Sequence, residues 1–155
     1  TLSLDLVRCS GSTGGRSFAG LLSGMTSLRG LELQMNALGD DGAVELAEGV
    51  RTLRALTSLN LSTNQISDTG AVALAEALKG FAHLLRLNLH ENHLGPVGGT
   101  TIASTVYSCI SLQHLDLGNN RLLDEGALAV AAALSDCPEL TYLDLSPWAA
   151  AAAAR

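Results

Sequence analysis

The feature that most constrains the fold of this chain is a repeat of 28 residues. Several columns of the sequence return at that interval: two of leucine, one of asparagine, one of leucine or isoleucine and one of glycine. They are Leu31, Leu59, Leu87, Leu115 and Leu143; Leu33, Leu61, Leu89, Leu117 and Leu145; Asn36, Asn64, Asn92 and Asn120; Leu38, Ile66, Leu94 and Leu122; and Gly42, Gly70, Gly98 and Gly126. Such a period indicates stacked repeats, because one unit cannot bury its apolar face alone.

Each repeat is predicted to hold one strand and one helix. The Leu-x-Leu alternation is typical of a strand with one buried face, so strands should begin near the first leucine column and stack as a parallel sheet. Apolar residues then follow at helical spacing, as in Ala71, Leu74, Ala75 and Leu78. We expect helices near residues 42–50, 70–79, 98–108 and 126–136.

Two polar columns have predicted structural roles. Asp40, Asp68 and Asp124 stand where each could cap the N-terminus of its own helix, and Pro96 replaces the aspartate in the remaining repeat. The asparagine column is expected to point inward, where an amide can satisfy backbone groups as the chain leaves the strand. Helices are about 10 Å across while strands lie about 4.8 Å apart, so stacking them should curve the sheet inward.

The segment Leu56–Ile66 reads Leu-x-x-Leu-x-Leu-x-x-Asn-x-Ile and resembles the leucine-rich repeat family. The repeat length and the glycine before each helix resemble its ribonuclease-inhibitor-like class, as in the repeat regions of NOD-like receptors and the Ran GTPase-activating protein. The resemblance implies an α/β solenoid shaped as a horseshoe arc, with the parallel sheet concave and the helices convex. We assign residues 1–148 to about five repeats, with a weak first unit at Leu4, Leu6 and Cys9 and an incomplete last one. The alanine-rich residues 149–155 are left uninterpreted.

No segment predicts a catalytic, cofactor or metal site. Gly11–Ser17 is superficially similar to a phosphate-binding loop, but Arg16 replaces the lysine, and we interpret the stretch as a strand-to-helix turn. His90 and His93 are three residues apart and straddle a strand end, whereas metalloprotease histidines are four apart on one helix. A shallow repeat trough is also a poor place to assemble a nucleophile, a base and an orienting group.

Cys109 and Cys137 are one repeat apart and therefore neighbours in space. Their column holds Met25, Leu53 and Phe81 in the other repeats, so we expect two buried thiols that behave as small hydrophobes. Three cysteines give no disulfide framework, which favours a reducing, intracellular compartment, with the organelle unassigned.

The outward face of the strands is the predicted partner-binding surface, because its side chains are not dictated by the core and rigid repeat arcs commonly bind there. Acids and amides fill the column between the paired leucines, which favours a protein partner with a basic or polar contact surface. The candidate residues are Glu32, Asn60, Arg86, Asn88, His90, His114, Asp116, Tyr142 and Asp144.

The charge balance argues against two classes of partner, nucleic acid and anionic membranes. With nine Lys and Arg residues and a net charge of −6, the chain lacks the basic cluster that nucleic acid or an anionic membrane requires. No apolar run reaches the roughly 18 residues needed to span a bilayer. The leading hypothesis is therefore a protein–protein interaction or scaffolding segment of a larger intracellular protein or assembly, without enzymatic activity. The alternative is a regulator of an enzyme, similar to the Ran GTPase-activating protein.

The two ends of the repeat array also predict neighbours. The expected strand with Leu4 and Leu6 begins directly after Thr1, and Trp148 stands at the asparagine position of the last unit. Because repeat arrays need polar caps over their first and last layers, we expect other parts of the protein, or other subunits, to cover both ends.

Overall fold

The computed structural model of the chain describes residues 1–3 and 11–147. Its strands form one parallel sheet in sequence order, β1-β2-β3-β4-β5-β6. Their bounds are β1 Leu2–Ser3, β2 Gly30–Glu32, β3 Ser58–Asn60, β4 Arg86–Asn88, β5 His114–Asp116 and β6 Tyr142–Asp144. From β2 onward the first leucine column pairs in register, as in Leu31 opposite Leu59, which confirms the predicted parallel stacking. The expected register of the first unit was wrong, since β1 pairs Leu2 and not Leu4 with Leu31. Leu4, Leu6, Cys9, Trp148 and the alanine-rich tail themselves lie outside the described residues.

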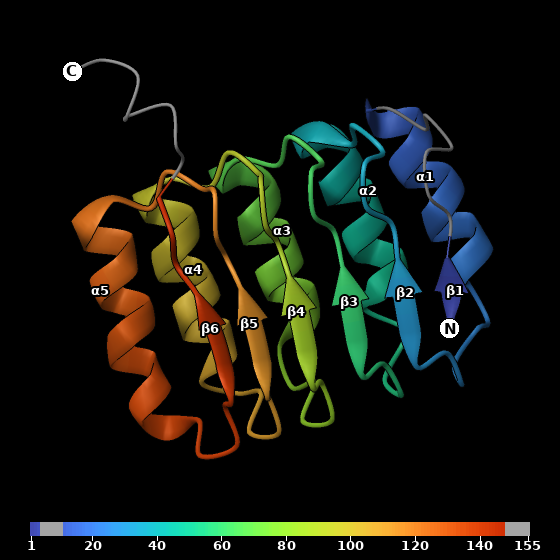
Figure 1. The fold of residues 1–155 in the computed structure, drawn as a ribbon. Helices are drawn as coiled ribbons and strands as arrows, with labels where there is room; N and C mark the ends of the chain where they lie inside the picture. Colours follow the sequence, from blue (N-terminus) through green and yellow to red (C-terminus); the bar gives the residue numbers. More distant parts are fainter. Residues whose placement is uncertain (4–10, 148–155) are drawn as a thin grey trace.

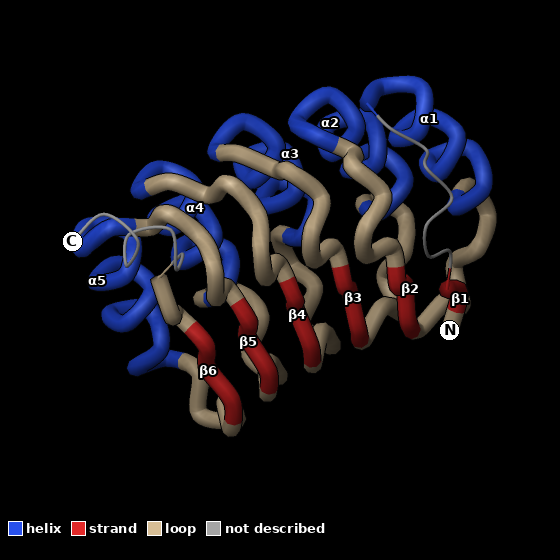
Figure 2. Tube along the Cα trace, turned by 45° about the horizontal axis from the view of Figure 1, so that its top comes forward, coloured by secondary structure: helices blue, strands red, loops and turns tan. Residues whose placement is uncertain are grey.

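Each of the strands β1 to β5 is followed by a helix, and the helices lie together on one face of the sheet (Figures 1 and 2). The helices are α1 Gly11–Leu22, α2 Gly39–Val50, α3 Asp68–Leu78, α4 Pro96–Val106 and α5 Leu123–Ala133, the last extended by the 3-10 turn η1 Leu134–Asp136. The row of helices is wider than the row of strands, so the sheet lies on the concave side of the arc.

Some predicted boundaries were wrong. The helices α2 to α5 begin two or three residues before the glycine column, since the turn that leaves each strand is shorter than the spacing indicated. The Gly11–Ser17 stretch is the first half of α1 and not a turn, although three glycines lower its helix propensity. Contact with α2 stabilises it, including an ion pair in which Arg16 donates to Glu45 at 2.8 Å.

The core lies between the sheet and the helices and is built mainly from the leucine columns and the apolar helix faces. Leu31, Leu59 and Leu115 are fully buried, as are the helix residues Leu46 and Ile102. Few aromatic rings are needed, because each layer is thin and repeats the same leucine contacts.

The cysteine column is confirmed for most of its members. Cys109 and Cys137 are buried thiols, and Leu53 and Phe81 fill the equivalent places. Met25 is the exception, with 38% of its surface exposed. Burial raises the pKa of the Cys109 thiol to about 11.

The asparagine column is the predicted buried amide ladder. Asn64, for example, donates its amide to Leu33 O at 2.8 Å and to Ser62 O at 3.1 Å. Its Oδ1 accepts the backbone N–H of Asn36 at 3.0 Å. Because the contacts with Leu33 and Asn36 join adjacent repeats, the amides connect the strand-to-helix turns of neighbouring repeats by hydrogen bonds.

The aspartate column does cap helices, but not the helices that we predicted. Asp68 lies in the first turn of α3, and its Oδ1 accepts the N–H groups of Gly95 and Gly98 at 2.6 and 2.7 Å, which caps α4. A Cβ at Gly98 would lie 2.6 Å from that same oxygen, so the glycine column makes room for the aspartate of the preceding repeat. Side chains in one repeat therefore satisfy helix N-termini in the next.

Candidate functional site

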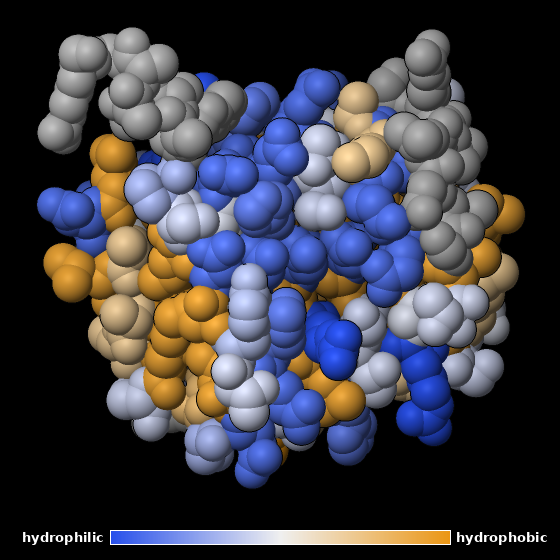
Figure 3. Space-filling view, viewed as in Figure 1, coloured by the Kyte–Doolittle hydropathy of each residue, from blue (hydrophilic) through white to orange (hydrophobic). Residues whose placement is uncertain are grey.

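The concave face is covered by polar side chains, which gather over the middle of the sheet in the space-filling view (Figure 3). The column between the paired leucines has a structural role that the sequence reasoning missed. Each member from β3 to β6 accepts the backbone N–H two residues later: Asn60 from Ser62 at 3.1 Å, Asn88 from His90 at 2.8 Å, Asp116 from Gly118 at 3.0 Å and Asp144 from Ser146 at 2.7 Å. Asn and Asp are the residues that form this local turn, so the composition of the column was an available signal.

The half of the face over β2 and β3 is a neutral to acidic polar ladder. Glu32 accepts from the Ser58 hydroxyl at 3.4 Å, and Asn60 donates to the Gln34 amide oxygen at 3.3 Å. Arg86 on β4 is exposed and is the cation among the predicted contact residues. These side chains offer a partner hydrogen bonds more than deep apolar contact.

The other half of the face, from the end of β4 to β6, holds several titratable side chains close together. His90 Nδ1 lies 3.2 Å from Asp116 Oδ1, and the other ring nitrogen, Nε2, lies 3.2 Å from the Asn119 side-chain amide. Asp144 follows on the next strand. One ligand-type atom from each of His90, Asp116 and Asp144 lies within 4.8 Å of the others. We call these three residues the His–Asp–Asp cluster.

A missing side chain gives Asp144 its position. Gly118 occupies the place that His90 and Ser62 occupy in earlier repeats, and a Cβ there would lie 2.7 Å from Asp144 Cγ. Without that Cβ, the Asp144 carboxylate lies over the strand end of the previous repeat. The hydrogen bond from the Ser146 backbone holds the pKa of Asp144 below its usual value.

An aromatic pair lies on the same strands. The rings of His114 and Tyr142 stack with centroids 4.0 Å apart and planes 6° from parallel. The charge of Asp116, with burial and the charge of Asp144, raises the pKa of the Tyr142 hydroxyl. The aromatic pair and the cluster therefore share one negatively charged region.

The structure brings the nine predicted residues onto one face, but it corrects the role of one. Asp116 is only 9% exposed, and its carboxylate bonds to the turn and to His90, so it is largely a structural residue and offers little surface to a partner. Sequence reasoning also missed Gly118 and Asn119. It considered His90 for metal only together with His93, its neighbour in sequence, and not with the two aspartates from other repeats.

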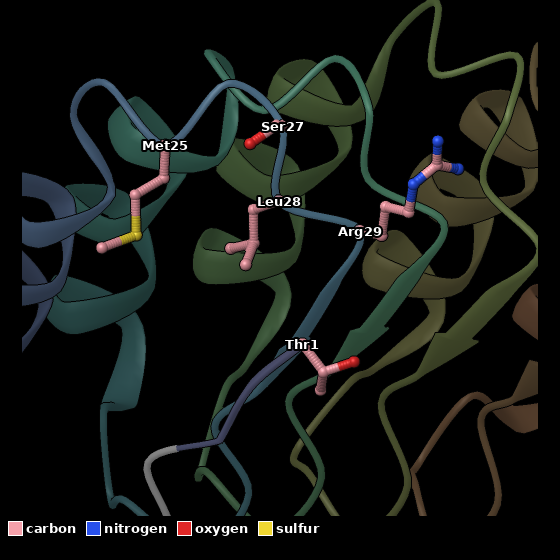
Figure 4. A pocket seen from close by; sticks show the side chains of 5 residues that line it. All are labelled: Thr1, Met25, Ser27, Leu28 and Arg29. Carbon is pink, nitrogen blue, oxygen red and sulfur yellow. The ribbon is translucent and has the colours of Figure 1, made fainter.

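A pocket of about 350 Å³ lies at the opposite edge of the sheet, lined by Thr1, Met25, Ser27, Leu28 and Arg29 (Figure 4). Its side chains come from Thr1, which precedes β1, and from the segment between α1 and β2. The lining holds two hydroxyls and one guanidinium, and none of the predicted partner-binding residues.

Comparison with known proteins supports the repeat assignment. The family model described as Leucine Rich repeat matches four segments, residues 24–47, 52–75, 82–103 and 108–131. No curated protein matches the chain. Within the described residues, no helix is long and apolar enough to cross a membrane.

Proposed function

The chain belongs to the leucine-rich repeat family, and from this premise we propose that it is a protein–protein interaction or scaffolding segment of a larger intracellular protein or assembly. Repeats of this family generally mediate protein–protein interactions. The observation that carries the proposal is the rigid concave face, where polar side chains from successive strands point away from the core.

The chemistry of that face favours a basic or polar protein surface as the partner. Glu32 on β2 and Asp144 on β6 are partly exposed carboxylates, and Tyr142 offers an exposed ring on the same strand as Asp144. Such a partner can pair with the carboxylates and stack on the ring. Apolar side chains exposed on α5, Leu123 at 70% and Leu128 at 69%, further support membership of a larger assembly.

Capture from cell extract with paired variants tests the proposal. The concave variant carries Glu32→Lys and Tyr142→Ala, which reverse one partly exposed carboxylate, remove one exposed ring and leave the buried turn contacts of Asp116 intact. The convex control carries Glu76→Lys and Lys79→Glu, which reverses an exposed ion pair on α3. Circular dichroism checks that both variants keep the helical content of the unchanged chain.

We expect a specific set of proteins, quantified by mass spectrometry, to be captured by the unchanged chain and the convex control but lost with the concave variant. Loss only with the convex control would place the contact on the helices and contradict the proposal for this face. Capture of no specific protein by the unchanged chain would contradict the interaction role itself. Acceleration of GTP hydrolysis by Ran would instead support the enzyme-regulator alternative.

A further inference from the structure

We propose that the His–Asp–Asp cluster is a binding site for a divalent first-row transition metal ion, with Zn²⁺ as the representative ligand. His90, Asp116 and Asp144 supply one imidazole nitrogen and two carboxylate oxygens from three successive repeats. Metal binding at this cluster does not depend on whether a protein partner binds the same face.

The distances suit one small ion. Zn²⁺ binds nitrogen and oxygen at about 2.0–2.2 Å in tetrahedral geometry, so two of its ligand atoms lie about 3.3 Å apart. His90 Nδ1 and Asp116 Oδ1 are already 3.2 Å apart. The Asp144 oxygen lies within 4.8 Å of both, a gap that rotation of one short side chain can close.

The donor set selects the class of metal. Imidazole suits Zn²⁺, Cu²⁺ and Ni²⁺, whereas Ca²⁺ requires six to eight oxygen ligands that this face does not assemble among the described residues. Aspartate carboxylates are charged at neutral pH, as metal ligands must be. Three protein ligands leave a further coordination position open to water.

A second residue supports the imidazole. Metal binding through Nδ1 requires the histidine proton to be on Nε2, where it needs an acceptor. The Asn119 atom that lies 3.2 Å from Nε2 is the amide nitrogen Nδ2, and turning the amide over about its terminal bond would bring its oxygen there, because an amide carries both a donor and an acceptor. Asn119 would thus act as a positioning residue for His90.

The arrangement occurs once in the repeat array. The same three positions one repeat earlier hold Ser62, Asn88 and Asp116, and two repeats earlier they hold Gln34, Asn60 and Asn88. Gly118 adds to the contrast, since a side chain there would displace the Asp144 carboxylate from the cluster. A generic feature of the repeat would have recurred in each layer.

Isothermal titration calorimetry with Zn²⁺ at neutral pH tests the proposal on the full chain. We expect binding of a single ion, weakened about tenfold or more by His90→Gln and by Asp144→Asn, each of which removes one ligand. Gly118→Ala should weaken it as well, and it displaces only the end of one flexible side chain, so its melting temperature without metal should stay near that of the unchanged chain. Zn²⁺ should raise the melting temperature of the unchanged chain but of none of the three variants.

Matched controls separate this site from other Zn²⁺-binding groups. His83→Gln removes an exposed histidine elsewhere, and Glu91→Gln removes a carboxylate next to His90 that bonds to the Thr63 hydroxyl. Both controls should bind Zn²⁺ like the unchanged chain. The proposal would be overturned if the unchanged chain did not bind Zn²⁺, or if His83→Gln lost binding. It would also be overturned if His90→Gln, Asp144→Asn and Gly118→Ala all kept the affinity of the unchanged chain.

Discussion

Replacing Asn92 with alanine should produce one of the largest single losses of stability available at the polar positions of this fold. The Asn92 Oδ1 accepts the backbone N–H of Asn64 at 3.1 Å and of Ile66 at 3.0 Å, in a region closed to water. Its amide donates to three carbonyls, those of Leu61, Leu89 and His90. Alanine removes all of these contacts together.

The magnitude follows from the groups left behind. His90 O keeps the N–H of Thr63 at 2.9 Å and Leu89 O keeps the amide of Asn120 at 2.9 Å, so these carbonyls lose little. The two N–H groups lose the oxygen that accepts them, at about 1–3 kcal/mol each, or about 2–6 kcal/mol together. Water entering the space left by the amide relieves part of that loss, and we expect about 2–4 kcal/mol.

Urea unfolding followed by far-ultraviolet circular dichroism measures the effect, with unchanged denaturant dependence as the sign of an intact unfolding transition. Asn88→Ala is the matched control, because Asn88 is only partly buried and its Oδ1 accepts a single N–H, that of His90 at 2.8 Å. It should lose about 0.5–1.5 kcal/mol. An Asn92→Ala loss no larger than that of Asn88→Ala would refute the assignment of Asn92 as a buried backbone anchor.

Two further predictions concern titratable groups. Burial raises the pKa of Asp40, but hydrogen bonds from the Ser67 hydroxyl and the Ser67 and Gly70 N–H groups outweigh it and hold the pKa below the ordinary value of 3.8. Its contribution to stability should therefore be full above that value and lost as pH falls through the lowered folded value, so acid melts of Asp40→Asn should show a weaker pH dependence than those of the unchanged chain. Because burial raises the pKa of Cys109 to about 11, this thiol should react with a thiol reagent at pH 8 only slowly in the folded chain, at a rate that rises on unfolding and is followed by peptide mapping of the labelled cysteine. Fast labelling of Cys109 without denaturant would contradict its buried position.

Most of the fold could be predicted from the sequence, because its period and alternation reflect short-range geometry that every repeat shares. Leu59 and Asn64 lie where their columns indicated, one in a strand facing the core and the other at the buried turn. Helix starts were less accurate, since Leu38 and Leu122 adopt helical angles without any side-chain cap to mark the boundary.

Contacts between repeats were harder to predict, because a column shows which residues recur but not which repeat they contact. Asp68 was assigned to its own helix and instead caps α4, one repeat further along. Likewise His90 meets Asp116 only because stacking brings residues that are 26 positions apart to one place on the sheet. The candidate site therefore depended on the offset between strands, which the sequence alone did not give.

The caps also make the junctions between neighbouring repeats unequal. Asp40 and Asp68 each accept backbone N–H groups at the start of the following helix, whereas Pro96 offers no carboxylate to the start of α5. In the language of one-dimensional cooperative chains, the coupling between neighbours at the α4–α5 junction lacks this capping contribution but keeps that of packing, since the backbones of α4 and α5 approach closely at Gly99 and Gly126. Hydrogen exchange should then be faster at the Leu123 amide than at the equivalent amides of Ser67 and Gly95, which donate to Asp40 and Asp68.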